Sequence, residues 1–249
     1  MLKFLPVAFI CGLMLAVSAS EKILVVAEDG FAEYLKTDIH RIGLENSRSG
    51  VSFQMSSFPV QDTAPVLRIG KDPCRGDYEN VLFAIRGYLF FANGENPVSG
   101  LTSGEADLIL SGGFSKWSDT LVPLKQICFG GRERFSRNNA GKKDPPWIWI
   151  NDPELALQIV SEDLTALGVI PLVSAGVVCK KTKLLPVDGV IPSPETVTDG
   201  SYPAVKRYYL SIRKDAPESI RKIYNRLQTK QIKEKLWNAG ILPAVETEK

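Results

Sequence analysis

The stretch that most constrains the fold lies late in the chain, at residues 185–211, and reads LPVDGVIPSPETVTDGSYPAVKRYYLS. Prolines and glycines interrupt it every few residues, so it cannot form one helix. It nevertheless ends in an aromatic, β-prone run at residues 207–212, which is typical of a buried strand. A long irregular path that leads into a core strand predicts a crossover between two lobes.

Residues 1–20 differ in composition from the rest of the chain. Lys3 is their only charged residue, residues 4–17 form an apolar run, and Val17-Ser18-Ala19 offers small residues for cleavage. These features are typical of a secretory signal peptide. A membrane anchor is less favoured, because the run is shorter than the ~20 residues that span a bilayer. We therefore expect a periplasmic protein, cleaved after Ala19 or Ser20.

The overall composition is that of a globular protein, with 44% hydrophobic and 23% charged residues. The chain has 249 residues, enough for two modest lobes with a sizeable core. Its net charge of +2 provides no basic excess for binding nucleic acid. Cys74, Cys128 and Cys179 lack C-x-x-C spacing, which argues against a zinc or thioredoxin-type site. Two alternatives remain for these three cysteines: one disulfide with one free thiol, or buried thiols without a disulfide.

Strand-like and helix-like segments alternate along the chain, and their periodicity distinguishes them. A strand followed by a turn and a helix is the beginning of a βα unit, so this alternation predicts an α/β fold. The expected strands cover residues 22–27, 51–55, 87–92, 124–129, 147–150 and 168–178, and the expected helices cover residues 31–42, 102–110, 153–167 and 217–237.

Several blocks resemble phosphate ABC-transporter substrate-binding proteins. They are LPVDGV at 185–190, PSPETV at 192–197, GSYP at 200–203, NGENP at 93–97, ILSGGFSKWS at 109–118 and LWNAGILPA at 236–244. The resemblance covers about residues 82–244. It implies a two-lobed periplasmic binding protein type 2 fold, with two crossover segments and an interlobe cleft. Lobe I would hold residues 21–93 and 190–249, and lobe II residues 94–189.

The resemblance also implies an anion site in lobe II. The family's loop G-R-x-x-x-S-G-T matches residues 128–141, CFGGRERFSRNNAG. Arg132 corresponds to the arginine that clamps the anion and Ser136 to the serine, while Arg137 and Asn138 replace glycine and threonine. A guanidinium grips an oxyanion through two parallel hydrogen bonds, and a helix start adds N–H donors. The alternative for the same residues is a solvated basic loop.

The family's first-lobe ligand motifs are degenerate in this chain. Residues 28–31, Glu-Asp-Gly-Phe, stand where the family has G-S-T-F, and two carboxylates there would repel an anion. Ser56 and Ser57 stand for a second loop without its glycines, and no G-A-S-D segment precedes Asn80. Either the ligand is not phosphate, or the chain has kept the fold and lost the ligand.

Other side chains give weaker signals. His40, the only histidine, is expected on the exposed side of the first helix and cannot form a metal site alone. Trp147 and Trp149 could stack on a ligand, but we expect them to pack in the core from a strand, which is the more common role. The sequence has no G-x-S-x-G, H-E-x-x-H or Walker motif. We expect no enzymatic activity, no cofactor and no metal.

Two functional hypotheses follow from the sequence. In the first, the protein is a monomeric, exported solute-binding protein that binds phosphate or another small anion and passes it to an ABC permease. In the second, it is a non-transport protein of the same fold that acts as an interaction or structural module. The crossover blocks, Arg132 and Ser136 favour the first hypothesis, and Glu28 and Asp29 favour the second.

Overall fold

The computed structural model describes residues 22–27, 31, 35, 37–39, 41, 52–56, 66–111, 124–130, 147–150, 152–172 and 181–244. Its strands are β1 (Lys22–Ala27), β2 (Ser52–Ser56), β3 (Leu67–Gly70), β4 (Tyr78–Asn93), β5 (Gln126–Gly130), β6 (Trp147–Ile150), β7 (Ala166–Pro171), β8 (Thr182–Leu185), β9 (Val205–Arg213) and β10 (Leu242–Pro243). Its helices are α2 (Ser103–Ser111), α3 (Pro153–Glu162), α4 (Pro194–Thr198), α5 (Glu218–Leu227) and α6 (Lys230–Asn238). Residues 31, 35, 37–39 and 41 are helical as well.

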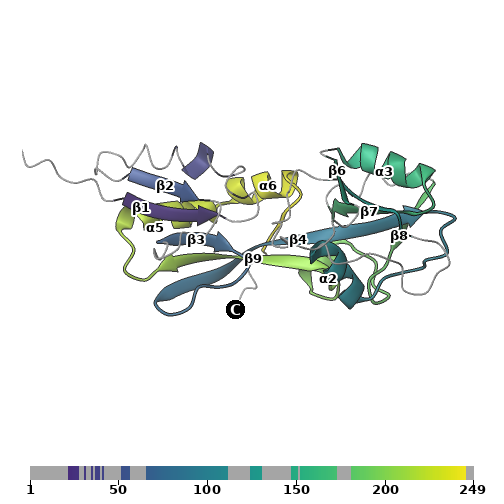
Figure 1. The fold of residues 1–249 in the computed structure, drawn as a ribbon. Coiled ribbons are helices and arrows are strands. Elements are labelled where there is room, and N and C mark those ends of the chain that lie inside the picture. Colours follow the sequence, from purple (N-terminus) through teal and green to yellow (C-terminus); the bar gives the residue numbers. More distant parts are fainter. Residues whose placement is uncertain are drawn as a thin grey trace, which may run out of the picture.

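The molecule is built along the 16-residue strand β4. Its first part pairs with β9 in antiparallel register, and its second part pairs with β7 and β8, also antiparallel. The hydrogen-bonded order is β2-β1-β3-β9-β4-β7-β5-β6. In Figure 1, β1–β3 and α5 lie at one end of an elongated molecule, and β5–β8 with α2 and α3 lie at the other. Strand β4 therefore belongs to both ends.

Each end has its own hydrophobic core. The first core lies under β1, β3, β9, α5 and α6 and includes Val25, Phe31, Leu35, Leu67, Ile69, Tyr208, Leu210, Ile223 and Leu236. The second core lies under β4, β5, β7, α2 and α3 and includes Tyr88, Leu89, Phe91, Ile109, Ile127, Cys128, Leu157, Val169 and Tyr202. Each large apolar side chain buried in this way stabilises the fold by ~1.5–3 kcal/mol. The two ends are thus stabilised by separate packing.

The stretch at residues 185–211 forms the second crossover. Asp188 (φ 48) and Gly189 (φ 78) form a tight turn, across which Val187 and Val190 exchange backbone hydrogen bonds of 3.0 and 2.9 Å. Oδ1 of Asp188 accepts a hydrogen bond from the backbone N–H of Ser103, 3.0 Å away, at the start of α2. The turn therefore ties the crossover to the second end of the molecule.

The same stretch continues through α4 into β9. Ser193 caps α4 through a capping box with Thr196, and Pro194 occupies the first turn, where its missing N–H is tolerated. The hydroxyl of Tyr202 then donates a buried 2.7 Å hydrogen bond to the carbonyl of Tyr88. Each motif of this stretch thus has a structural role in holding the crossover.

The predicted elements agree with the structure in most places and differ from it in several. The helix expected to reach residue 167 ends at Glu162, because the carboxylate of Asp163 accepts hydrogen bonds from the N–H and hydroxyl of Thr165 (2.7 and 2.6 Å) and forms a turn before β7. The single helix expected at residues 217–237 is α5 and α6, separated at the extended residue Thr229. Strand β4 begins well before residue 87, and β3, β8, β10 and α4 were not predicted.

An ion pair fixes the helix after β1 against α6, because Lys235 Nζ contacts the carboxylate of the buried Asp38.

Within the described part of the chain, no helix has both the length and the apolar character needed to cross a membrane.

Candidate functional site

The two sets of parallel strands point their carboxyl ends toward each other. Strands β1, β2 and β3 are parallel, and β5, β6 and β7 are parallel. Strand β7 runs antiparallel to β4, whereas β3 and β4 both run antiparallel to β9 and therefore share a direction. The two sets thus end on opposite sides of the middle of β4 and β9. In open α/β sheets, ligands bind outside the carboxyl ends of the strands.

The register of the strands locates this middle region. The last residue of β3, Gly70, pairs with Tyr209, which pairs with Leu82 of β4. The last residue of β7, Pro171, pairs with Tyr88 of β4. The part of β4 between the two strand ends is therefore residues 83–87, and the facing part of β9 is residues 205–208.

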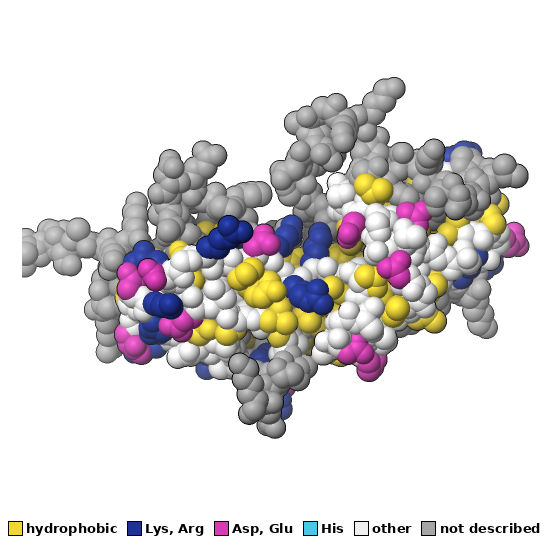
Figure 2. All heavy atoms as spheres, turned by 90° about the horizontal axis from the view of Figure 1, so that it is seen from below, with side chains coloured by type: hydrophobic (Ala, Val, Ile, Leu, Met, Phe, Trp, Pro, Cys, Tyr) yellow, Lys and Arg dark blue, Asp and Glu magenta, His cyan; other side chains and the backbone are white. Residues whose placement is uncertain are grey.

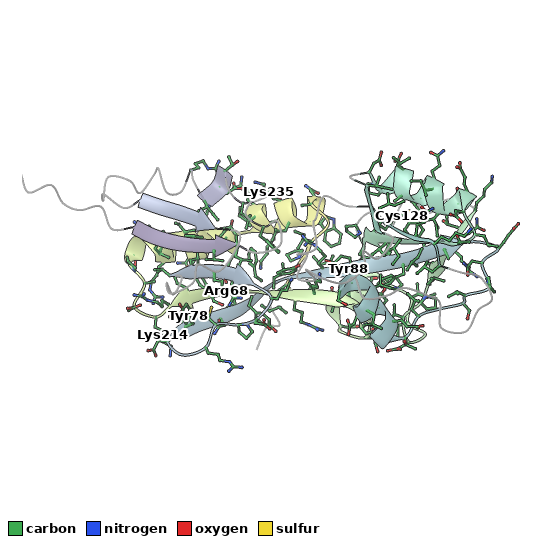
Figure 3. All side chains as sticks on the ribbon, viewed as in Figure 1. Arg68, Tyr78, Tyr88, Cys128, Lys214 and Lys235 are labelled. Atoms are coloured by element: carbon green, nitrogen blue, oxygen red, sulfur yellow. The ribbon has the colours of Figure 1, made fainter. Side chains whose placement is uncertain are left out.

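One face of this region carries two cations and two tyrosines. Arg86 pairs directly with Lys206, and Ala84 pairs with Tyr208. Partners in an antiparallel pair project to the same face, as do alternate residues along each strand, so Tyr88 shares it. We call Arg86, Tyr88, Lys206 and Tyr208 the crossover floor. Figure 3 places Tyr88 near the middle of the molecule, with Tyr78 and Lys214 at one end and Cys128 toward the other.

A β-bulge decides which face Arg86 occupies. The pairing of β4 with β9 shifts register between Leu82 and Ala84, so Phe83 is an extra residue. The bulge inverts the alternation of side chains along β4. Before the bulge, odd-numbered residues such as Val81 share the face of Tyr208, and after it even-numbered residues such as Ala84 and Arg86 do. Arg86 therefore shares the face of Val81, which packs on the first core, rather than the face of Leu82, which is 38% exposed.

Arg86 is fully buried between aromatic rings. Its guanidinium carbon lies 5.6 Å from the ring centre of Phe31 and 5.5 Å from that of Tyr208. Its Nη1 donates a 3.3 Å hydrogen bond to the hydroxyl of Tyr208. Cation–π contacts are worth about 2 kcal/mol when desolvated, so the rings compensate in part for the burial of the charge. The side chain of Arg86 is thereby held in one position.

Lys206 packs on the second core instead. Its Nζ lies 5.4 Å from the ring centre of Tyr88, and its side chain is only partly buried. Tyr88 is itself held on both sides: its N–H donates to the carbonyl of Ala204 at 3.2 Å, and its carbonyl accepts from Tyr202. Burial raises the pKa of Tyr202 above its usual value, so this hydroxyl keeps its proton and remains a donor. The GSYP motif thus supports the residue on which Lys206 rests.

The opposite face of the β4–β9 pair has a different character. It carries Leu82 and the exposed Arg207. Figure 2, seen from below, shows hydrophobic side chains beside Lys and Arg in the middle of the molecule.

Most residues predicted from the sequence to bind a ligand lie outside the described part of the chain. This applies to Ser57, Arg132, Ser136, Arg137 and Asn138, and also to Glu28 and Asp29. Ser56 is the last residue of β2, but its side chain is not among those described. His40 and Cys179 also lie outside, and for Trp147 and Trp149 only their place in β6 is described.

Metal-ligating side chains do not cluster in the part of the chain that the structure describes. Among the described residues, no group of three or more His, Cys, Asp or Glu side chains could hold a metal ion. Cys74 and Cys128 are both thiols. Burial, followed by the charge of Asp163, raises the pKa of the Cys128 thiol to about 11. This thiol is therefore protonated at neutral pH and packs as an apolar side chain.

Sequence reasoning missed Arg86 and Lys206. The signal for Arg86 was present, because it is the single charge in the otherwise apolar run at residues 81–92. A charge within a continuous apolar strand requires a buried partner or a function. Lys206 gave no such signal, since a lysine beside Arg207 at the start of a strand reads as an ordinary solvated residue.

Comparison of the sequence with protein-family models and with curated proteins gives no match. Solved structures do resemble it. A possible phosphate binding protein from Planctomyces limnophilus superposes with a TM-score of 0.69 at 15% identity, over 92% of this chain and 95% of that one. PstS from Borrelia burgdorferi gives 0.64 at 16% identity, over 90% and 100%. An ABC-type phosphate transport receptor from Vibrio cholerae gives 0.61 at 14% identity, over 88% and 99%.

These likenesses show the fold. The chain has the α/β fold of type 2 periplasmic binding proteins, as the sequence blocks predicted. Identities of this size carry nothing further about the ligand.

Proposed function

We propose that this protein is an exported solute-binding protein that binds phosphate or another small oxyanion above the crossover floor, in a cleft between two lobes. The observation that carries the proposal is positional. Arg86 and Lys206 lie on one face of β4 and β9, in the interval where the carboxyl ends of two opposed sets of parallel strands converge.

The lobes of the proposal are residues 21–93 with 190–249, and residues 94–189. The two separate cores support a division into two lobes, and residues 88–92 of β4 with Val197, Tyr202 and Ala204 pack in the second core. A ligand that contacts both lobes favours their closed arrangement, because it binds that arrangement with more contacts.

We assign the upper part of the site to the loop after β5. Strand β5 ends at Gly130, on the side that faces the crossover floor, and Arg132 follows two residues later. In the proposal Arg132 is the main charged contact, Ser136, Arg137 and Asn138 add further donors, and Ser56 and Ser57 after β2 contribute from the other lobe. Removal of residues 1–19 or 1–20 on export, a monomeric state and an ABC permease as partner complete the proposed function.

A thermal-shift screen of the exported protein tests this function. The ligands are phosphate, sulfate, molybdate and organic anions, with sodium chloride at equal ionic strength as the control. A ligand at a hundred times its Kd stabilises the folded state by ~2.7 kcal/mol. For a protein of this size we therefore expect Tm to rise by about 5–10 °C. No shift with any anion would contradict the proposal and favour an interaction module.

The role of Arg132 has its own test. Arg132→Ala removes a charge-assisted pair of hydrogen bonds, so we expect a loss of ~2–5 kcal/mol in binding, or roughly thirtyfold to several thousandfold. Arg134→Ala makes the same charge change in the same loop and serves as the control. Calorimetric titration measures both variants. Equal affinity of Arg132→Ala and the wild type would remove Arg132 from the site.

A further inference from the structure

We draw no further inference here: the strongest candidate, the side-chain cluster of Arg68, Cys74, Asn80 and Ser211 beside the loop between β3 and β4, rests on a lone thiol, and nothing in the described part of the chain points to a ligand or reaction partner for it.

Discussion

Gly168 in β7 gives the sharpest test of the packing that positions one side of the site. A Cβ atom at this residue would lie 2.0, 2.2 and 2.5 Å from three ring atoms of Phe91, its cross-strand partner in β4. Carbon atoms normally approach to ~3.5–4.0 Å, so the ring would have to move by about 1.5 Å. Phe91 is fully buried in the second core and has no such room.

The expected cost follows from this overlap. Overpacking a core costs ~1–3 kcal/mol, and here the new atom is fixed to a backbone that pairs with strands on both sides. We expect Gly168→Ala to reach ~3 kcal/mol, which lowers Tm by about 6–12 °C in a protein of this size. Urea denaturation and differential scanning calorimetry measure it.

A double variant and a control make the result specific. Phe91→Leu removes the ring that the added methyl group of Gly168→Ala would meet, so the two changes together should cost at least ~1 kcal/mol less than their sum. Gly104→Ala in α2 meets nothing nearer than 4.0 Å and should stabilise the protein by ~0.5–1 kcal/mol. Wild-type stability of Gly168→Ala, or simple additivity with Phe91→Leu, would refute the described contact.

Three further predictions concern single interactions. Tyr202→Phe removes the buried hydrogen bond to Tyr88 and should destabilise the protein by ~1 kcal/mol in urea denaturation; an unchanged midpoint would argue against that bond. The Cys128 thiol, with its pKa of about 11, should resist Ellman's reagent at pH 8 in the folded protein and react in denaturant, whereas fast native labelling would contradict its burial. Burial raises the pKa of Asp163 but hydrogen bonds from Thr165 outweigh it, so the carboxyl titrates below its usual value and stabilises the fold above about pH 4. Thr165→Val should raise the pKa of Asp163 in an NMR titration. The variant should be less stable than the wild type at neutral pH, and this difference should become smaller as the pH falls below about 4 and the carboxyl is protonated in both proteins. An unchanged pKa of Asp163 would count against the contact.

The sequence was sufficient for the fold because its motifs are structural. The turn at Asp188 and Gly189, the cap at Ser193 and the buried Tyr202 each determine one step of the second crossover. Residues with such roles produce local patterns that a reader of the sequence can find. The same reasoning explains why these motifs say nothing about the ligand.

The elements that the sequence did not predict are set by tertiary contacts. Strand β10 has two residues and exists because Leu242 and Pro243 pair with β4. Strand β3 has four residues between β1 and β9, too short for a periodic signal. The separation of α5 from α6 depends on the extended backbone of Thr229. No glycine or proline lies beside this residue, so the sequence does not predict a break in the helix.

The crossover floor was not predicted from the sequence, for a related reason. The crossover floor joins Arg86 to Lys206, which are far apart in sequence, through strand register. That register depends on the bulge at Phe83, and one residue more or less in β4 would move Arg86 to the other face. Neither feature leaves a local pattern, so the floor became visible only in the folded chain.

The most direct test of the anion site is anomalous diffraction from crystals grown with arsenate, a tetrahedral analogue of phosphate. We predict an arsenic peak above the crossover floor, over the part of β4 and β9 between the ends of β3 and β7. Well-diffracting crystals with no peak there, or with arsenic bound only on the opposite face beside Arg207, would contradict the account.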